Sequence, residues 1–318
     1  MKAEPALVPA AENETSLAVI RSLGRQGIPI VASANTTIAK GLWSKYVKHR
    51  LKQPPRGNPQ DTVDWLVQGA RKNLFKVFLP TGDYYVWLAS HYSEILSEYM
   101  RIPVASKEVN DKTILKEETY KSCERYGIPY PKTYFIKSMD EVYDLADRLK
   151  YPVIIKSRIS FGITPRVKGI LIHDSKELSQ KYVVCEVAEF LSEYDHLEYP
   201  LIQEYIPGGM QNLYTVGTFM NKRSHPVAIF CGRKIRQLPV DAGSCCMAEC
   251  AYDEQAIKNS IELLTKIGWY GAAEVEIKKD ERTGEFKIIE INPRSYSWIW
   301  LAVQLGIDIP YLWYRSAL

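Results

Sequence analysis

The sequence predicts an α/β unit with a parallel sheet, followed by two α+β units that together make a larger fold. Three observations support this prediction. The chain has 318 residues, which is too many for one ordinary core. Strand and helix patterns alternate over residues 5–110, as they do in parallel sheets. Beyond residue 200, strands predominate and a single helix interrupts them. We therefore expect units at residues 1–110, 111–195 and 196–318.

The composition is typical of a globular protein, with 46% apolar and 25% charged residues and a formal net charge of +4. No long block of like charges is present, so we expect no nucleic-acid partner. No apolar stretch is long enough to cross a bilayer, and the N-terminus lacks a secretory signal pattern. We therefore expect a cytoplasmic protein without a membrane partner. The six cysteines form no CxxC pair, which favours free structural thiols over a zinc site.

In the first unit, strands and helices are expected to alternate along the chain. The expected strands are residues 6–8, 28–32, 47–51 and 77–80, with helices ending near residue 27, over 62–73 and up to about residue 99. Ligands of parallel sheets lie beyond the carboxyl ends of the strands. Asp83 follows the last of these strands and is therefore placed for use by a ligand. A turn or helix-capping role for Asp83 is the alternative.

The later units are expected to be mainly strands. Their expected elements are strands over 133–136, 152–156, 169–172, 201–206, 213–219, 227–232, 272–278 and 286–291, and helices over 140–149, from 175 and over 254–267.

The most informative pattern is a hairpin near the end of the chain. Two strands flank a polar turn that contains Gly284, and pairing them about Thr283 places Glu276 opposite Glu290. Asn292 shares the face of Glu290, because strand side chains alternate. Two opposed carboxylates repel each other unless a cation or a proton lies between them. The apolar neighbours of these residues argue against a solvent-exposed acidic hairpin. An all-oxygen set of this kind suits Mg²⁺.

Three further features accompany the hairpin. Lys156 ends a buried strand, and Lys112 lies at a helix start, where a cation needs an anionic partner. The strand over residues 203–206 stops at a Pro-Gly-Gly break, which frees main-chain groups to bind a planar ligand.

In this order, the motifs Asp-Lys (111–112), Pro-Val-Ile-Ile-Lys (152–156), Gln-Glu-Tyr-Ile-Pro-Gly (203–208), Glu276 and Glu-Ile-Asn-Pro-Arg (290–294) resemble the ATP-grasp superfamily. The resemblance spans about residues 110–294. It is nearest in kind to the carboxylate–amine ligases related to the carbamoyl-phosphate synthase large chain. The upstream residues look like the N-terminal α/β domain of that family.

The resemblance implies a role for each matching residue. Lys112 and Lys156 would hold the phosphates of ATP. The segment Gln203, Glu204, Tyr205 and Ile206 would bind the adenine edge through the main chain at Glu204 and Ile206, and Ile154 and Ile289 would pack on the adenine faces. Glu276, Glu290 and Asn292 would hold Mg²⁺, with Mn²⁺ as an alternative. Arg294 would steady an acyl phosphate or substrate carboxylate. Arg236 lies before a turn at residues 241–244 and is preferred over Arg233 as a second cation that would bind a substrate carboxylate. A surface role for Arg236 is the alternative.

The implied reaction couples a small-molecule carboxylate to an amine through an acyl phosphate and releases ADP and phosphate. The alternatives are an enzyme of the same fold that forms an acyl phosphate or carboxyphosphate, and a nucleotide-binding protein that has lost catalysis. The chain departs from the family pattern in having no ribose-binding acid at residues 209–212, where Gln211 or Asn212 would substitute. The loop over residues 157–167 has only one glycine, with Arg158 and Arg166 available to close on phosphates. Aromatic residues near the C-terminus suggest packing on the N-terminal domain or on a second subunit of a homodimer.

Overall fold

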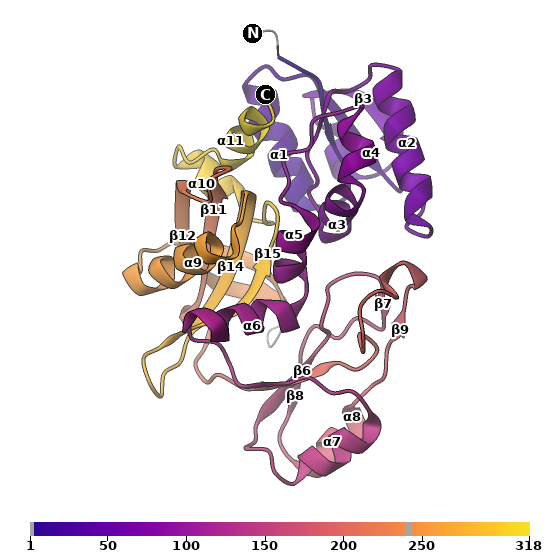
Figure 1. Ribbon diagram of the computed structural model, residues 1–318. Coiled ribbons are helices and arrows are strands. Elements are labelled where there is room, and N and C mark those ends of the chain that lie inside the picture. The colour runs from indigo at the N-terminus through magenta and orange to yellow at the C-terminus, as the bar shows by residue number, and fades with distance from the viewer. Residues whose placement is uncertain (1–2, 239–242) are drawn as a thin grey trace.

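The computed structural model describes residues 3–238 and 243–318. Its first unit holds a parallel four-stranded sheet with the order β3-β2-β1-β4 (Figure 1). The strands are β1 (Ala6–Val8), β2 (Ile30–Ala34), β3 (Val47–Lys52) and β4 (Val77–Phe78), and they are joined or followed by α1 (Glu14–Arg25), the short η1 (Lys40–Trp43), α2 (Pro59–Arg71), α3 (Asp83–His91) and α4 (Ser93–Ser97). The first, second and fourth of these strands are buried along their length, as expected for a sheet covered on both faces.

The second unit is built on an antiparallel sheet with the order β5-β10-β6-β8. Its elements are β5 (Thr133–Tyr134), α7 (Met139–Ala146), β6 (Val153–Lys156), β8 (Ile170–Ile172), α8 (Ser175–Lys181), η2 (Glu189–Leu191) and β10 (Leu201–Glu204), with a small pair formed by β7 (Ile163–Thr164) and β9 (Glu186–Val187). The expected boundary at residue 195 assigns β10 to the third unit. In the structure, β10 pairs with both β5 and β6 and therefore lies inside the second sheet.

The third unit is a five-stranded antiparallel sheet with the order β13-β12-β11-β14-β15. Its elements are η3 (Met210–Asn212), β11 (Leu213–Met220), β12 (Pro226–Leu238), β13 (Ser244–Cys250), α9 (Glu254–Ile267), β14 (Gly271–Lys279) and β15 (Phe286–Asn292). Helix α9 is capped at its N-terminus by Asp253, whose carboxylate accepts hydrogen bonds from two main-chain N–H groups. Its C-terminal cap is Gly268, which has left-handed backbone angles.

Helices α5 (Lys107–Ile114) and α6 (Lys116–Tyr126) connect the first unit to the others. Figure 1 shows them beside the third sheet, although the expected boundary places most of them in the second unit. The Tyr120 hydroxyl on α6 donates to the main-chain oxygen of Ile289 at 2.6 Å, which fixes this helix against β15. The position of α6 therefore determines which of its side chains face the third sheet.

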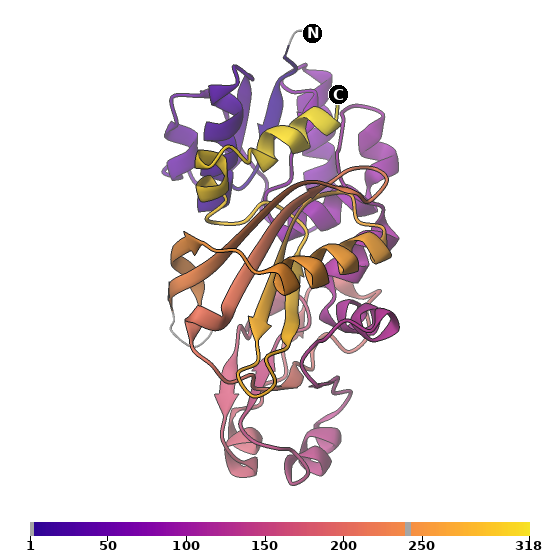
Figure 2. The same cartoon turned by 90° about the vertical axis from the view of Figure 1, so that its left-hand side faces the viewer.

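The C-terminal aromatics pack on the N-terminal unit of the same chain. Helices α10 (Trp300–Gln304) and α11 (Ile309–Ser316) lie beside α1, where they share one apolar core (Figure 2). The Trp313 indole donates to the Pro103 oxygen at 2.5 Å, and the Tyr314 hydroxyl donates to the Glu4 oxygen at 2.8 Å. Of the two expected packing partners, the N-terminal unit is the one seen.

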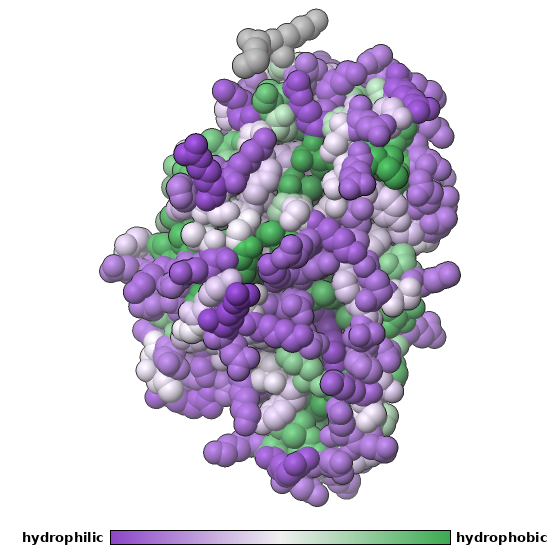
Figure 3. Space-filling model, viewed as in Figure 1, coloured by the Kyte–Doolittle hydropathy of each residue, from purple (hydrophilic) through white to green (hydrophobic). Residues whose placement is uncertain are grey.

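No helix in the described ranges is long and apolar enough to cross a membrane. The face of the molecule in Figure 3 is mostly hydrophilic, with apolar residues in small separate areas. The parallel sheet followed by antiparallel sheets agrees with the expected fold class.

Candidate active site

A cavity of about 980 Å³ lies where the three units meet. The first unit lines it at the ends of its strands, the second through β6, the following loop and β10, and the third through β12, β14 and β15. Most of the expected site residues line this cavity, namely Ile154, Lys156, Gln203, Glu204, Tyr205, Ile206, Glu276, Ile289, Glu290, Asn292 and Arg294. Asp83 lines it as well, while Lys112 and Arg236 are not among the lining residues.

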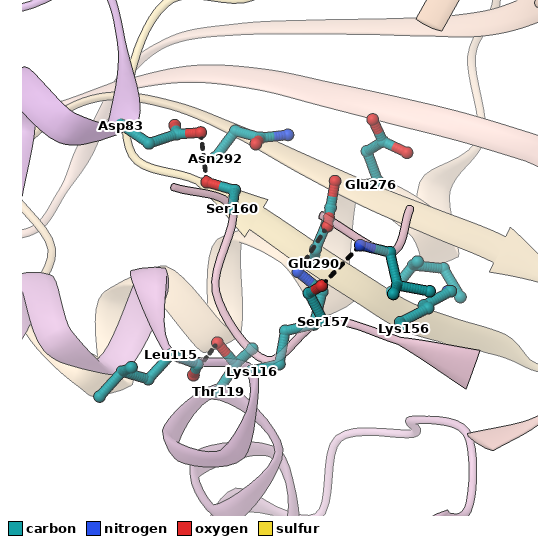
Figure 4. A network of polar contacts seen from close by, with 12 residues as sticks. Asp83, Leu115, Lys116, Thr119, Lys156, Ser157, Ser160, Glu276, Glu290 and Asn292 are labelled. Carbon is teal, nitrogen blue, oxygen red and sulfur yellow. Dashed lines mark hydrogen bonds and ion pairs between the residues drawn. The ribbon is translucent and has the colours of Figure 1, made fainter. Parts of the chain in front are cut away.

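The hairpin forms the expected Glu276–Glu290 pair, but its register shifts by one residue between Glu276 and Ile277, toward the turn. Glu276 lies opposite Glu290, and Asn292 lies opposite Glu274. Each of the two expected metal-binding carboxylates forms an ion pair with a lysine. Lys116 Nζ lies 3.0 Å from Glu290 Oε2 (Figure 4). Lys234 Nζ lies 2.9 Å from Glu276 Oε2. The positive charge that opposed carboxylates require is therefore supplied here by two lysines that sequence reasoning missed.

The electrostatics of these carboxylates follow from their neighbours. The Lys116 ammonium holds the pKa of Glu290 far below its usual range, against the effect of burial. Burial, reinforced by the charge of Glu276, raises the pKa of Glu274 to about 8. The Asn292 amide group donates to Glu274 Oε2 at 3.0 Å. The two strands therefore present an ionised carboxylate beside a more weakly acidic one.

The donor set fits a hard divalent cation. Glu276, Glu290 and Asn292 offer only oxygen, which is what Mg²⁺ prefers. Within the described ranges, no group of three or more His, Cys, Asp or Glu side chains is arranged to hold a metal ion. A cation at this hairpin would therefore need further oxygen ligands from water or phosphate, as Mg²⁺ commonly has.

Lys156 lies in the cavity as expected. Its ammonium donates to Gln203 Oε1 at 3.2 Å, and burial lowers its pKa to about 8, partly offset by the charge of Glu290. Such a lysine is ready to take an anion as its partner.

Lys112, expected to hold the phosphates, is not brought to the cavity in this structure. Lys112 lies on α5 and pairs with Glu108 at 3.0 Å, outside the cavity lining. The chain leaves the helix at Leu115, which has extended backbone angles, and α6 then begins with Lys116 facing β15. Lys116, four residues after Lys112, lines the cavity instead, because the break between the helices changes which side chains face the sheet.

The segment 203–206 lines the cavity, as do Ile154 and Ile289, the two residues predicted to pack on the adenine faces. The N–H of Glu204 is already engaged, since it donates to the Lys132 oxygen at 2.9 Å. The Ile206 oxygen accepts from Lys278 Nζ at 2.7 Å. Lys278 was not expected, although it lies two and four residues after Glu276 and Glu274 on the same strand face, so alternation alone could have found it.

Neither proposed substitute for a ribose-binding acid lines the cavity. Asn212 instead donates to Glu281 at 2.6 Å. Of the two loop arginines, Arg166 lines the cavity, whereas Arg158 is buried and bound to Glu117 and to main-chain oxygens. Arg158 is therefore a structural residue.

Asp83 joins the three units. Arg294 Nε donates to Asp83 Oδ1 at 2.5 Å, and a second guanidinium nitrogen lies 3.3 Å from Oδ2. The Ser160 hydroxyl donates to Asp83 Oδ2 at 2.6 Å (Figure 4). Although burial opposes ionisation, the Arg294 guanidinium lowers the pKa of Asp83. Arg294 is thus in the cavity as expected, and its guanidinium group is held by a carboxylate from the N-terminal sheet edge.

Arg236, expected to bind a substrate carboxylate, is not brought to the cavity in this structure. Arg236 is exposed, and irregular pairing on both sides of it interrupts the alternation of β12. As a result Lys234 and Gln237 line the cavity, and Arg233 pairs with Glu249 on β13. Residues 239–242 of the expected turn lie outside the described residues. No simple sequence rule identifies the residues at which a strand bulges, so the sequence alone could not predict that Lys234 faces the cavity.

None of the cysteines in the described part of the chain is joined in a disulfide.

The comparisons with known proteins agree with this geometry. The family model of the carbamoyl-phosphate synthase L chain ATP-binding domain matches residues 116–298, more than half of the chain. A D-aspartate ligase from Enterococcus faecium is 27% identical over 230 residues, which cover 69% of this chain and 53% of the ligase. The chain thus spans about half the length of this curated relative.

Two solved structures share the fold. An L-amino acid ligase from Bacillus licheniformis has a TM-score of 0.74 at 16% identity, covering 100% of this chain and 74% of that one. The biotin carboxylase domain of a Hydrogenobacter thermophilus 2-oxoglutarate carboxylase, solved with MgADP, ADP and bicarbonate, has a TM-score of 0.73 at 18% identity and covers 99% and 69%. With the family match, these findings confirm the resemblance to ATP-grasp proteins. The chain belongs to the family of the carbamoyl-phosphate synthase L chain ATP-binding domain.

Proposed function

We propose that this protein is an Mg-ATP-dependent ligase that activates a carboxylate as an acyl phosphate and couples it to an amine. The observation that carries the proposal is the opposed pair Glu276 and Glu290, which lies in one cavity with Lys116 and Lys156. A protein that only bound a nucleotide would have no need for two opposed carboxylates with cations on both sides.

The residues suit the two steps of this reaction. A carboxylate oxygen of the substrate attacks the γ-phosphorus of ATP, and ADP leaves with the electrons of the broken P–O bond. Lys116, Lys156 and Arg166 would neutralise the phosphates, and positioning with charge neutralisation is most of what such a transfer requires. Mg²⁺, held by Glu276, Glu290 and Asn292, would offset charge on the phosphate oxygens.

In the second step an amine attacks the acyl carbon, and phosphate leaves with the electrons of the C–O bond while the amine proton passes to solvent or a nearby base. Arg294 lies where its guanidinium could bind the acyl phosphate. To do so it must share or exchange its bond to Asp83. The names of the relatives, D-aspartate ligase and L-amino acid ligase, favour an amino acid among the substrates.

One observation favours a second candidate, a nucleotide-binding protein without ligase activity. Adenine binding was expected at the main chain of Glu204 and Ile206, and two of the four main-chain groups there already have partners: the Glu204 N–H donates to the Lys132 oxygen, and the Ile206 oxygen accepts from Lys278. Lys278 would have to move for an adenine to bind the Ile206 oxygen.

The test is ADP release from Mg-ATP with pools of amino acids and small carboxylic acids. Glu290→Gln should reduce release by at least roughly 10²-fold, because it removes a carboxylate that would hold Mg²⁺ at the transferring phosphoryl group. Glu285→Gln, at the exposed turn of the same hairpin, is the matched control and should retain activity. The ligase is supported if wild type and Glu285→Gln release ADP only in the presence of a pool member, and if Glu290→Gln loses this release. ATP binding without release from any pool would favour the binding protein.

A further inference from the structure

The cavity extends well beyond the parts that the proposed reaction assigns to ATP. Ligand pockets commonly measure roughly 300–1,000 Å³, and this one, at about 980 Å³, lies at the upper end of that range. Much of the additional wall comes from the first unit, from residues that follow β1, β2, β3 and β4. These are the carboxyl ends of parallel strands, the usual place for a ligand in such a sheet. The wall contributed by the first unit is called the N-terminal lobe below.

Glu12 in the N-terminal lobe has a carboxylate oxygen that lacks a hydrogen-bond donor among the described residues. It follows β1 and lines the cavity, and its Oε2 atom is buried without a hydrogen-bond partner in the described part of the chain. Glu14, two residues later, lines the same cavity but pairs with Lys40. A buried carboxylate oxygen without a donor is costly, so a group that brings positively charged N–H donors would be bound favourably there.

The surroundings of Glu12 supply no such donor. Two cations of this wall, Lys52 and Arg56, line the cavity, but no ion pair within 4.0 Å joins either of them to Glu12 in the described ranges. The Arg56 guanidinium lies 5.6 Å from the Tyr84 ring centre and 5.3 Å from that of Tyr85. Burial raises the pKa of Tyr85 to about 12, with Glu12 raising it further and Arg56 lowering it, so both charges act on the same hydroxyl. Because neither cation is paired with Glu12 in the described ranges, the carboxylate of Glu12 remains available to a ligand.

The N-terminal lobe is continuous with the phosphate region. Strand β4 is the neighbour of β1 in the sheet, and Asp83, which follows β4, contacts Arg294 directly. A small molecule bound by Glu12 at one end would therefore extend past Asp83 toward Arg294. In the proposed reaction this is the direction of the carboxylate to be phosphorylated.

We propose that the N-terminal lobe binds the carboxylate substrate, that this substrate also carries a primary ammonium group, and that Glu12 recognises the ammonium. The substrate class is thus an amino acid or a similar amino carboxylate. This inference rests on the proposed function for the role of the carboxylate, but the recognition of the ammonium by Glu12 can be tested without turnover.

The experiment is an equilibrium titration of the full chain, without ATP, against the proteinogenic L-amino acids and their D-enantiomers. Each amino acid that binds is then compared with its desamino analogue, as alanine with propionate. Wild type should prefer the amino compound by roughly tenfold or more, as expected for a charge-assisted hydrogen bond. Glu12→Gln should remove that preference and leave ATP binding unchanged. Glu94→Gln, an exposed substitution on α4, is the control and should keep the preference.

Two results would overturn the inference: no amino acid binds to a wild-type protein that binds ATP, or Glu12→Gln keeps the preference for the amino compound. Failure of the proposed function has a different signature. If the ammonium preference depends on Glu12 while ADP release is unaffected by Glu290→Gln, the binding site stands and the ligase assignment falls.

Discussion

The β14–β15 hairpin and the α5–α6 connection both supply charges to one cavity, but they differ in how they place them. In the hairpin, Glu276 lies opposite Glu290 as the sequence predicts, although the pairing shifts by one residue between Glu276 and Ile277. In the connection, the expected Lys112 points to Glu108, and Lys116 reaches the site instead. A local break between two helices is enough to change which residue faces the sheet. The opposed charges of this hairpin could therefore be assigned from sequence, whereas the charge that follows the break between α5 and α6 could not.

The largest expected effect concerns Lys234, which pairs with Glu276. Lys234→Met leaves a carboxylate on the hairpin without its cation, and the side chain of Lys234 is only 5% exposed. Breaking a buried ion pair from one side typically costs about 3–5 kcal/mol. We expect a loss of that order in the free energy of unfolding, measured by urea denaturation. Arg236→Ala, on the exposed side of the same strand, should change it by no more than about 0.5 kcal/mol. Equal effects would show that the irregular strand does not turn Lys234 inward.

The second prediction compares the two helix lysines. Lys116→Ala should weaken ATP binding by roughly 10- to 100-fold, because a charged partner of the phosphates is lost. Lys112→Ala should leave the dissociation constant nearly unchanged, since Lys112 is outside the cavity lining. Isothermal titration with Mg-ATP measures both. The opposite ranking would return the phosphate role to Lys112 and remove the contrast between hairpin and helix.

A smaller effect is expected from pH at Lys156. Burial lowers the pKa of Lys156 to about 8, so the free lysine is charged below that pH and neutral above it. Bound phosphate favours the charged form and raises the pKa, so binding above pH 8 requires uptake of a proton. ATP affinity should therefore fall as pH rises above about 8, by up to about tenfold per pH unit. Titrations between pH 7 and 9.5 should show this dependence in wild type and lose it in Lys156→Met. A slope that persists in the variant would assign the titration to another group.

The smallest predicted effect concerns the ion pairs of Lys287 in the same hairpin. Lys287 pairs with Glu204 at 2.6 Å and with Asp280 at 3.1 Å, at the turn end of β15. Lys287→Gln should cost about 1 kcal/mol in the free energy of unfolding, because glutamine keeps a hydrogen-bond donor and Asp280 keeps its ion pair with Arg282. ATP binding should change little, because Lys287 does not line the cavity. A large loss of ATP affinity would mean that this pair holds the adenine-binding segment in place.

The sequence by itself determined the alternation of the first unit, the hairpin with its opposed carboxylates and the strand that ends at Lys156. These depend on local periodicity and on short-range pairing, which a sequence displays directly. Tertiary structure decided which residues reach the cavity from elsewhere. Lys116 reaches the cavity because α6 packs on β15, and Lys234 reaches it because its strand is irregular. Asp83 and Arg294, which are 211 residues apart in the chain, form their bond only because two units pack together. Such contacts depend on how units pack, and packing is not encoded by any pattern within a single segment.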